Sequence, residues 1–201
     1  GLRLPPNIAP IQVVLVPIYK TEDDLEKIRQ YLSNIIDYCA EHNITYYFDD
    51  REKLSPGYKF NEWEMKGVPI RLEVGLRDKE KNQITIARRD TNEKLIKTYN
   101  ETFDFLQQLL IEIQNNLFNE ALTFQQKNPH QISSYDEFQK HIQKGAFIVC
   151  GWDGSNETEA KIKDETNATI RCIPLNQNIS NLKCIYSGNP AKYQAIFAKA
   201  Y

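Results

Sequence analysis

The chain has 201 residues, of which 41% are hydrophobic and 26% are charged, and its formal net charge is −2. This composition is typical of a globular protein with an apolar core, and it excludes disordered and collagen-like chains. The small negative charge excludes a basic coat over the whole surface, so any contact with nucleic acid must be a local patch. The length suits one large domain or two small ones, and we expect two.

No apolar run in the sequence approaches the roughly 18–20 residues that cross a membrane, and the opening GLRLPPNIAP lacks the layout of a secretory signal. We therefore expect a cytoplasmic protein that makes no membrane contact. Because the first residue is not Met, we also expect a piece of something longer. Free thiols are the expectation for cysteines in the cytoplasm. The four cysteines are Cys39, Cys150, Cys172 and Cys184.

The first predicted elements form a strand, helix, strand unit. IQVVLVPI, residues 11–18, is an apolar and β-branched run typical of a buried strand, and TYYFDD, residues 45–50, is a second strand. Between them Thr21 caps a helix whose apolar residues recur every three or four positions. This order favours a right-handed parallel crossover. It places Asp49, Asp50 and Arg51 at the carboxyl end of a strand, where open α/β sheets usually bind ligands.

The stretch SPGYKFNEWEMKGVPIRLEVGLRD, residues 55–78, predicts a short helix and then a strand. The helix runs from about Lys59 to Lys66 and ends at Gly67. Residues 68–76 and 83–89 are predicted to form a hairpin around the polar turn RDKEKN. In its first strand Val68, Ile70, Leu72 and Val74 share one face, whereas Arg71 and Glu73 share the other.

A long helix is expected from about Glu101 to Lys127, and KNPHQISS is the candidate linker. The second unit is predicted to begin with a helix capped by Ser134, and Thr158 to Thr166 forms another helix. The predicted strands are AFIVCGW, TIRCIPL, KCIYSG and YQAIFAKAY. The expected core residues are Phe147, Val149, Ile170, Ile173 and Phe197.

Together these elements predict two α/β units. Residues 1–128 form a mixed sheet with about three helices, and residues 129–201 form a smaller α+β domain.

One surface of the short helix suits an unpaired base. Phe60 and Glu64 are four residues apart and share a helical face, so a ring could stack on a base while the carboxylate accepts hydrogen bonds from a guanine edge. Arg71 and Arg77 add guanidinium groups for guanine acceptors or phosphate. From Lys59 to Arg89 eight Lys and Arg residues face five Asp and Glu, which makes the segment +3. The alternative is that Phe60 and Trp63 are core residues and the charges only solvate a hairpin.

The string DDREKLSPGYKFNEWEMKGVPIRLEVGLRD, with GLRLPPNIAPIQVVLVPI before it and ARRD after it, resembles the anticodon-binding domain of prolyl-tRNA synthetases of the archaeal/eukaryotic type. CGWDGSNETEAKIKDETNATIRCIPL and NPAKYQAIFAKAY resemble the extra C-terminal domain of that subgroup, so the resemblance covers essentially the whole chain. It implies a class II ligase that uses ATP and Mg to attach proline to its tRNA. The catalytic domain that holds these cofactors does not match any part of the chain, and we expect the chain alone to be inactive.

The resemblance also implies partners and contact residues. The partners are the tRNA for proline, the missing catalytic domain and, in the full-length protein, a second copy. Phe60, Glu64, Arg71 and Arg77 fall on positions implicated in anticodon contact. Lys59, Lys66 and Asp78 belong to the same motif with less clear roles. In the family the C-terminal carboxylate, here Tyr201, reaches toward the catalytic domain.

The resembling C-terminal domains often hold a structural zinc with two pairs of cysteines. Here Cys150 and Cys184 occupy the first place of each pair, whereas Ser155 and Ser187 occupy the second places. Serine hydroxyls are poor zinc ligands compared with thiolates, so we do not expect zinc. Cys172 lies outside this pattern, although it could stand in as a ligand.

The sequence suggests two alternative functions. The first is a stand-alone RNA-binding or regulatory module derived from such a domain. The second is a nucleotide-binding α/β enzyme, which the lack of a glycine-rich loop after the first strand disfavours. A metal site at Asp49 and Asp50 is disfavoured because the sequence places no third ligand near them.

Overall fold

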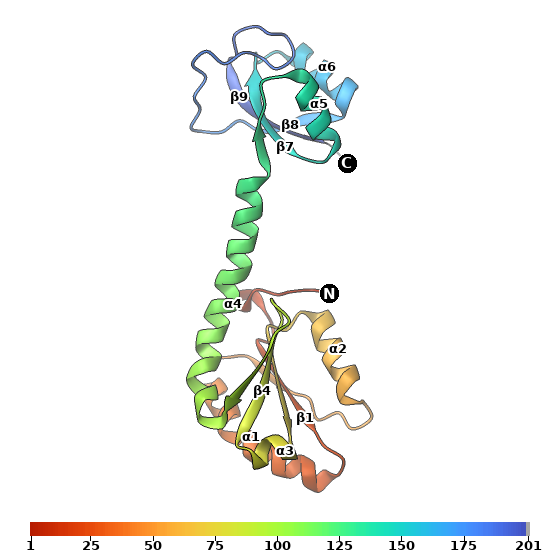
Figure 1. Ribbon diagram of the computed structural model, residues 1–201, viewed down its shortest axis with the longest axis vertical. Helices are drawn as coiled ribbons and strands as arrows, with labels where there is room; N and C mark the ends of the chain where they lie inside the picture. The colour runs from red at the N-terminus through yellow and green to blue at the C-terminus, as the bar shows by residue number, and fades with distance from the viewer. Residues whose placement is uncertain (200–201) are drawn as a thin grey trace. The chain divides into compact units, whose positions relative to one another are not determined.

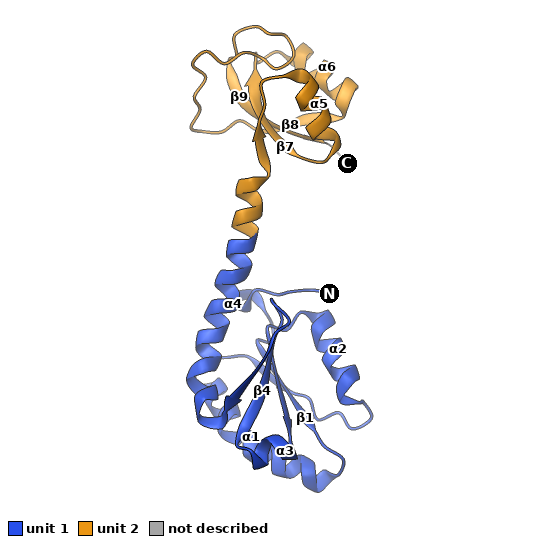
Figure 2. Cartoon of the chain, viewed as in Figure 1, with its two compact units in different colours: residues 1–120 blue, residues 121–201 orange. Residues whose placement is uncertain are grey.

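Residues 1–199 are described by a computed structural model and divide into two units (Figures 1 and 2). Unit 1 comprises Gly1–Glu120, and unit 2 begins at Ala121. The division falls within the long helix α4 (Tyr99–Lys127), whereas the expected boundary near residue 128 lies at its end. Tyr201 lies outside the described residues.

Unit 1 contains a five-stranded mixed sheet with the order β2-β1-β3-β4-β5. The first three strands of this order are parallel to one another, and β4 and β5 continue the sheet antiparallel. The strands are β1 (Val13–Ile18), β2 (Tyr46–Phe48), β3 (Ile70–Gly75), β4 (Gln83–Arg88) and β5 (Lys94–Thr98). The helical elements are η1 (Pro6–Ile8), α1 (Glu22–Glu41), α2 (Pro56–Lys66), α3 (Leu76–Glu80) and α4.

The two faces of this sheet are covered unequally (Figure 1). On one face α1 and α4 enclose the main core, to which β1 contributes Val13 and Leu15 and β3 contributes Leu72. On the other face α2 covers a smaller apolar cluster that contains Val14, Val16 and Trp63. The alternation of side chains along each strand produces this division. The part of the second face that β4 and β5 form lies beside α2.

Helix α1 begins where the sequence predicts. The Thr21 side chain accepts a hydrogen bond from Asp24 N, and the Asp24 carboxylate accepts one from Thr21 N, which completes a capping box. The apolar stripe predicted from Leu25 to Cys39 is buried against the sheet. The strand, helix, strand crossover is parallel, as expected.

Two predictions for unit 1 are wrong in detail. The polar stretch between β3 and β4 is not a simple hairpin turn, because residues 76–80 form the short helix α3. Asp78 accepts a hydrogen bond from Gly75 N at 2.9 Å and starts this helix. Strand β5 was not predicted. Its five residues follow a tight turn and alternate between half-buried and exposed, which is a weak signal in so short a segment.

Unit 2 contains a four-stranded sheet with the order β6-β7-β9-β8. Strand β6 is parallel to β7, and the other pairs are antiparallel. The strands are β6 (Pro129–Gln131), β7 (Phe147–Trp152), β8 (Ala168–Cys172) and β9 (Tyr193–Lys199), and the helices are α5 (Tyr135–Gln143) and α6 (Asn156–Thr166). The core includes Phe138, Ile148, Cys150, Ile162 and Phe197.

Three expectations for unit 2 are corrected. The candidate linker KNPHQISS contributes β6, because residues 129–131 pair with β7. The segment KCIYSG is not a strand and forms only isolated bridges to Gly151 and Pro190. Phe147 and Ile173 are exposed by 41% and 39%, so they are not core residues. On β7 the core face is formed by Ile148 and Cys150, one position away from the residues that we expected, and a shift of one residue exchanges the two faces of a strand.

Within residues 1–199, no helix has both the length and the apolar character needed to cross a membrane.

Candidate nucleic-acid interface

Helix α2 has clear signals at both ends. The Ser55 side chain accepts a hydrogen bond from Tyr58 N at 3.3 Å, and Pro56 occupies the first turn, where its missing N–H is not needed. The helix ends at Gly67, whose φ of 75° is left-handed. A Cβ at this position would lie 2.9 Å from Leu2 Cγ, so the chain requires glycine there. These signals fix which residues of α2 face the sheet.

A buried carboxylate after β2 anchors α2 to the sheet. Trp63 Nε1 donates to Asp49 Oδ2 at 2.7 Å, and the Arg51 guanidinium bonds both Asp49 oxygens at 2.8 and 2.7 Å. Burial raises the pKa of Asp49, but the hydrogen bonds from Arg51 and Trp63 outweigh this effect, so the pKa lies below its ordinary value. Asp49 therefore remains ionised and holds the helix in place.

Lys59 belongs to this anchor and not to the exposed surface. It is 1% exposed, and its ammonium donates to the Asp49 carbonyl oxygen at 2.9 Å. Burial lowers the pKa of Lys59, and the nearby Asp49 carboxylate opposes this shift. Contrary to our expectation, the side chain has almost no surface to offer RNA.

The residues Phe60, Glu64 and Arg71 do come together beside α2. Arg71 on β3 pairs with Ala87 on β4, and Ala87 pairs with Lys94 on β5. The side chains of Arg71, Ala87 and Lys94 therefore project from the same face of the sheet. The Arg71 guanidinium carbon lies 4.4 Å from the centre of the Phe60 ring, and Lys94 Nζ lies 5.3 Å from it. Two cations therefore converge on one aromatic ring.

The same cations are held by two carboxylates. Arg71 bonds Glu73 Oε1 at 3.0 Å and Glu64 Oε1 at 2.9 Å, and Lys94 Nζ bonds Glu73 Oε2 at 2.8 Å. The Arg71 and Glu73 side chains are only 7% and 8% exposed, whereas Glu64 and Lys94 are 44% and 52% exposed. The alternative that these charges only solvate a hairpin does not hold for Arg71 and Glu73, because α2 covers part of this face of the sheet. We call Phe60, Glu64, Arg71, Glu73 and Lys94 the sheet-face cluster.

A depression of about 50 Å³ opens beside the sheet-face cluster, with Glu64, Arg71 and Lys94 among its walls. This space suits one or two water molecules, each of which occupies about 30 Å³ in the liquid. A nucleobase could enter only if the exposed Glu64 or Lys94 side chain moved aside. The Arg71 side chain is therefore mostly buried. It borders a depression whose access depends on the positions of the exposed Glu64 and Lys94 side chains.

Arg77 lies apart from the cluster. It is exposed on α3, beyond the carboxyl end of β3, whereas Arg71 is the second residue of that strand. The four residues from Arg71 to the end of β3 span about 13 Å at 3.3 Å per residue. Arg77 thus lies beyond the other end of β3 from Arg71 and outside the sheet-face cluster. Asp78 next to it accepts hydrogen bonds from Gly75 N and Gln83 Nε2, which positions α3.

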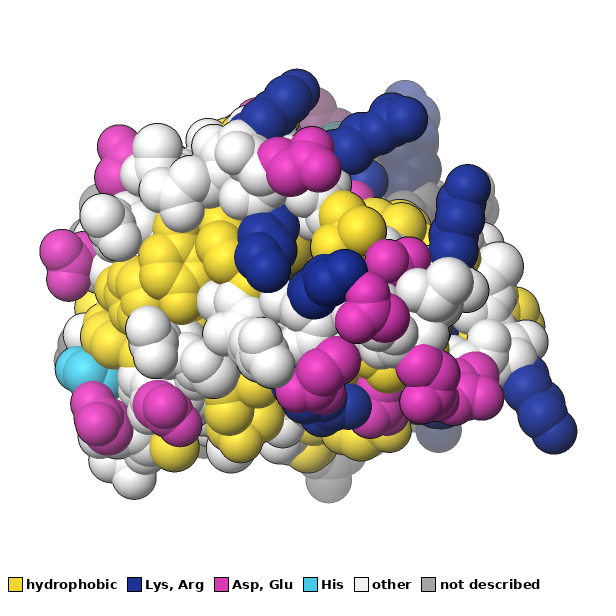
Figure 3. All heavy atoms as spheres, turned by 90° about the horizontal axis from the view of Figure 1, so that it is seen from below, with side chains coloured by type: hydrophobic (Ala, Val, Ile, Leu, Met, Phe, Trp, Pro, Cys, Tyr) yellow, Lys and Arg dark blue, Asp and Glu magenta, His cyan; other side chains and the backbone are white. Residues whose placement is uncertain are grey.

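The expected local positive patch is only partly neutralised by ion pairs. Four of its eight cations are paired within the fold. They are Lys59, Lys66, Arg71 and Arg88. Figure 3, which looks at the end of unit 1 that carries α1 and α3, shows basic and acidic side chains mixed over this face. On this face, a preference for RNA would come from the arrangement of individual groups and not from a continuous positive field.

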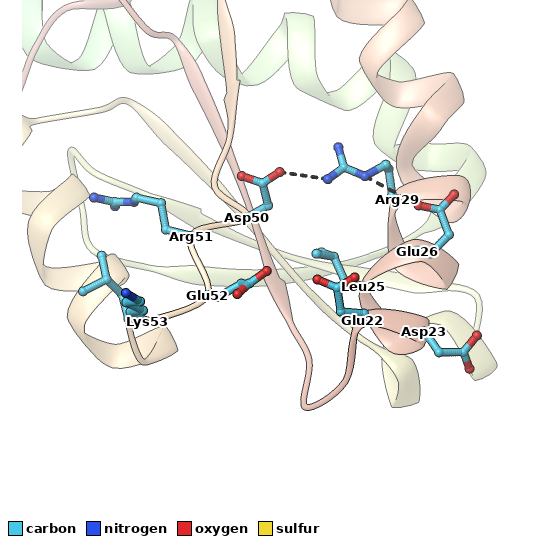
Figure 4. Close-up of a pocket in the computed structure, with 10 residues that line it drawn as sticks. Glu22, Asp23, Leu25, Glu26, Arg29, Asp50, Arg51, Glu52 and Lys53 are labelled. Carbon is cyan, nitrogen blue, oxygen red and sulfur yellow. Dashed lines mark hydrogen bonds and ion pairs between the residues drawn. The ribbon is translucent and has the colours of Figure 1, made fainter.

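A larger, open pocket of about 980 Å³ lies between α1 and the loop after β2 (Figure 4). This is the carboxyl end of parallel strands, as the sequence predicts for Asp49 to Arg51. Arg29 bonds Asp50 Oδ2 at 2.8 Å, and Glu22, Glu26 and Glu52 line the same space. Asp49 and Asp50 have different partners, since Asp49 bonds Trp63 and Arg51. The two carboxylates do not form a joint site.

Two family models match the chain. Residues 12–109 match the anticodon binding domain, and residues 135–201 match the C-terminal region of prolyl-tRNA synthetase. The chain belongs with the C-terminal, anticodon-binding part of prolyl-tRNA synthetases. The first match contains every member of the sheet-face cluster.

Curated relatives of this synthetase part carry the name proline–tRNA ligase. The protein from Phocaeicola vulgatus is 43% identical over 204 residues, and that from Flavobacterium psychrophilum is 45% identical over 202 residues. Each alignment covers the whole chain but only 41% of the relative, so the chain spans about two-fifths of the length of these relatives. They are bacterial proteins, and the expected archaeal/eukaryotic type is not borne out.

The four positions of the zinc pattern, which are Cys150, Ser155, Cys184 and Ser187, lie close together. Two of them, Ser155 and Ser187, donate hydrogen bonds to Asp153. Asp153 accepts hydrogen bonds from Ser187 Oγ at 2.6 Å and from Ser155 N at 3.0 Å. Burial raises the pKa of the Cys150 thiol to about 12, and the nearby Cys184 adds a smaller effect. Cys172 is exposed on β8. Among the described residues, no group of three or more His, Cys, Asp or Glu side chains could hold a metal ion.

Sequence reasoning missed Lys94 and the role of Glu73. Lys94 was missed because β5 was not predicted, and only the pairing of β4 with β5 brings Lys94 next to Arg71. The +2 spacing of Arg71 and Glu73 did indicate that they share a face, and the structure adds that this face is partly covered.

Proposed function

We propose that this chain grips the anticodon of proline tRNA for a proline–tRNA ligase. The observation that carries the proposal is the sheet-face cluster, in which an exposed carboxylate and two cations surround one aromatic ring inside the matched anticodon binding domain. Codons for proline begin with CC, so the anticodons of the corresponding tRNAs carry two guanines. A guanine offers N–H donors on its Watson–Crick edge and the acceptors O6 and N7 on its other edge.

The cluster has a matching group for each part of a guanine. The Glu64 carboxylate accepts from the N–H donors, Arg71 or Lys94 donates to the acceptors, and Phe60 supplies a ring for stacking. Entry of the base replaces the hydrogen-bonded ion pair between Arg71 and Glu64. This exchange keeps both charges satisfied and favours guanine over bases that lack these donors.

Arg77 and Lys66 suit a different part of the anticodon loop. Both are exposed, and both lie outside the cluster. We assign Arg77 to the second guanine or to a phosphate and Lys66 to a phosphate. Asp78 acts through α3, whose start it caps.

The remaining part of such a ligase would supply the chemistry. We expect ATP and Mg to bind in that catalytic part, and the whole protein to form a homodimer in the cytoplasm, where translation uses its product. The hydrogen-bonded arrangement around Asp153 supports a C-terminal domain that folds without zinc.

The test is a binding titration of this chain with the anticodon stem-loop of proline tRNA and with versions in which each anticodon guanine is exchanged. We expect each exchange to weaken binding by about 1–3 kcal/mol, the range for one bidentate base contact. Equal affinity for all stem-loops would instead indicate a generic RNA-binding module.

A pair of charge-matched variants sharpens this test. Glu64→Gln should relax the choice at one guanine, because the carboxylate that reads the N–H donors is lost. Glu62→Gln removes the same charge from the same helix but lies outside the cluster, and it should leave the discrimination unchanged. Equal behaviour of the two variants would exclude a base-reading role for Glu64.

A further inference from the structure

We propose that Glu73 is a positioning residue for anticodon recognition, which keeps Arg71 and Lys94 oriented while Glu64 is exchanged for the base. This inference rests on the proposed function. It concerns a side chain that is buried and that would not itself touch the RNA.

The Glu73 carboxylate holds both cations of the sheet-face cluster. Its Oε1 accepts from Arg71 Nε at 3.0 Å, and its Oε2 accepts from Lys94 Nζ at 2.8 Å. Arg71 lies two residues earlier on β3, and Lys94 lies two strands away on β5. The neighbours of Glu73 across the sheet are the uncharged Val16 and Thr85. Both carboxylate oxygens are thus committed to the two cations.

Exposure separates the roles of the two carboxylates that bind Arg71. The Glu73 side chain is 8% exposed, whereas the Glu64 side chain is 44% exposed and projects from a helix at the rim. The exposed partner can leave at low cost, because water or a base replaces its hydrogen bond. A buried partner cannot, because its departure would leave the buried Arg71 charge without its main partner in a poorly solvated place.

The bonding pattern of Arg71 fits this division of roles. Its Nε and one terminal nitrogen face Glu73, while the other terminal nitrogen, Nη1, bonds Glu64 Oε1 at 2.9 Å and the Phe60 carbonyl oxygen at 3.3 Å. Release of Glu64 frees one N–H of Nη1, whose other bond goes to the Phe60 carbonyl oxygen, and leaves the Glu73 pair intact. The guanidinium therefore keeps its place beside Phe60 and presents one free N–H group to the incoming base.

The decisive variant is Glu73→Gln, which keeps the shape but removes the charge that holds both cations. We expect it to reduce discrimination between the cognate stem-loop and the guanine-exchanged stem-loops by about 5- to 150-fold, the equivalent of one bidentate contact. Binding to the exchanged stem-loops should change by less than about threefold. Discrimination equal to wild type would overturn the proposal.

Asp90→Asn is the matched control. Asp90 is also a buried carboxylate of unit 1, with 0% side-chain exposure, and its partners are Arg88 and Asn116. We expect a comparable loss of stability but unchanged discrimination. If both variants lost discrimination in proportion to their stability, Glu73 would have a structural role only, and the proposal would be wrong.

A second readout uses the wild-type protein, so it does not depend on the folding of a variant. The Arg71 Nε–H group reports on the Glu73 pair, and we expect its NMR signal to remain protected from solvent exchange when the cognate stem-loop binds. Loss of that protection on binding would overturn the proposal. If the proposed function itself were wrong, the result would differ, because the wild-type protein would not distinguish the stem-loops at all.

Discussion

At the scale of single residues, charge burial decides what each ionisable group can do. Asp49 and Asp50 are adjacent in sequence, yet the Asp49 side chain is fully buried and accepts four hydrogen bonds from Arg51 and Trp63, whereas the Asp50 side chain is 45% exposed and pairs with Arg29. Removal of one member of a buried pair is costly because its partner keeps a charge that water cannot reach. An exposed pair contributes little.

Asp49→Asn should therefore destabilise unit 1 by about 3–5 kcal/mol at pH 7. Asp50→Asn is the neighbouring control, and it should cost about 1 kcal/mol or less. Urea unfolding followed by Trp63 fluorescence, in a Trp152→Phe background, measures both. Equal losses would mean that the Asp49 pairs do not anchor α2.

The effect of Asp49 should also depend on pH. Its folded-state pKa lies below the ordinary value of 3.8, so its ionised form stabilises the fold above about pH 4. This contribution is lost as the pH falls through the lowered folded-state pKa. The stability difference between wild type and Asp49→Asn should then shrink below pH 4, as measured by urea unfolding from pH 7 to pH 2. A difference that persists undiminished would contradict the assigned direction of the shift.

At the scale of elements, α2 determines where the sheet-face cluster lies, since it carries Phe60 and Glu64 and covers part of β3. Its length is set by Ser55 at one end and Gly67 at the other. Residues 1–4 also rest on this end of the helix, because Leu4 N bonds the Gly67 carbonyl oxygen at 3.1 Å.

Gly67→Ala should destabilise unit 1 by at least about 1–2 kcal/mol, because the new Cβ meets a left-handed backbone and Leu2. Gly57→Ala lies in the first turn of the same helix, where nothing lies within 4 Å of the added Cβ, and it should be neutral or stabilising. Thermal unfolding compares the two. A neutral Gly67→Ala variant would show that α2 can end in another way.

At the scale of the whole molecule, each unit has its own core, so we expect each to respond separately to changes within it. The core of unit 1 contains no residue of unit 2, and the reverse also holds among the described residues. Trp63 and Trp152 report on the two units separately.

Zinc provides a test of unit 2. Neither zinc nor a chelator should change the unfolding of the wild-type chain, because Ser155 and Ser187 bond within the arrangement around Asp153. The double variant Ser155→Cys and Ser187→Cys should lose about 1 kcal/mol without metal, since Ser155 caps α6, and it should be stabilised by zinc. Only the Trp152 signal should respond. A zinc-dependent rise in the unfolding temperature of the wild-type protein would show that the domain retains a metal site.

The sequence alone determined the order of the main elements and the position of α2. Periodicity predicts α1 and α4, and Thr21 and Ser134 occupy the predicted N-caps because capping depends on a few adjacent residues, although the Ser134 side chain makes no capping hydrogen bond. Helix α2 begins at Pro56, three residues before its predicted start near Lys59. Motif resemblance indicated the anticodon-binding family, and it singled out Phe60, Glu64 and Arg71. These signals depend on residues that are close together in the sequence, so they can be recognised without knowledge of the fold.

Only the tertiary structure decided which of these side chains meet and which are covered. Lys59 and Arg71 are both cations of one motif, yet one is buried on Asp49 and the other borders an opening beside Glu64 and Lys94. Lys94 reaches the cluster only through the pairing of β4 with β5, and Arg77 is separated from it by the length of β3. Burial and the pairing of distant strands depend on the whole fold, and no pattern of neighbouring residues encodes them.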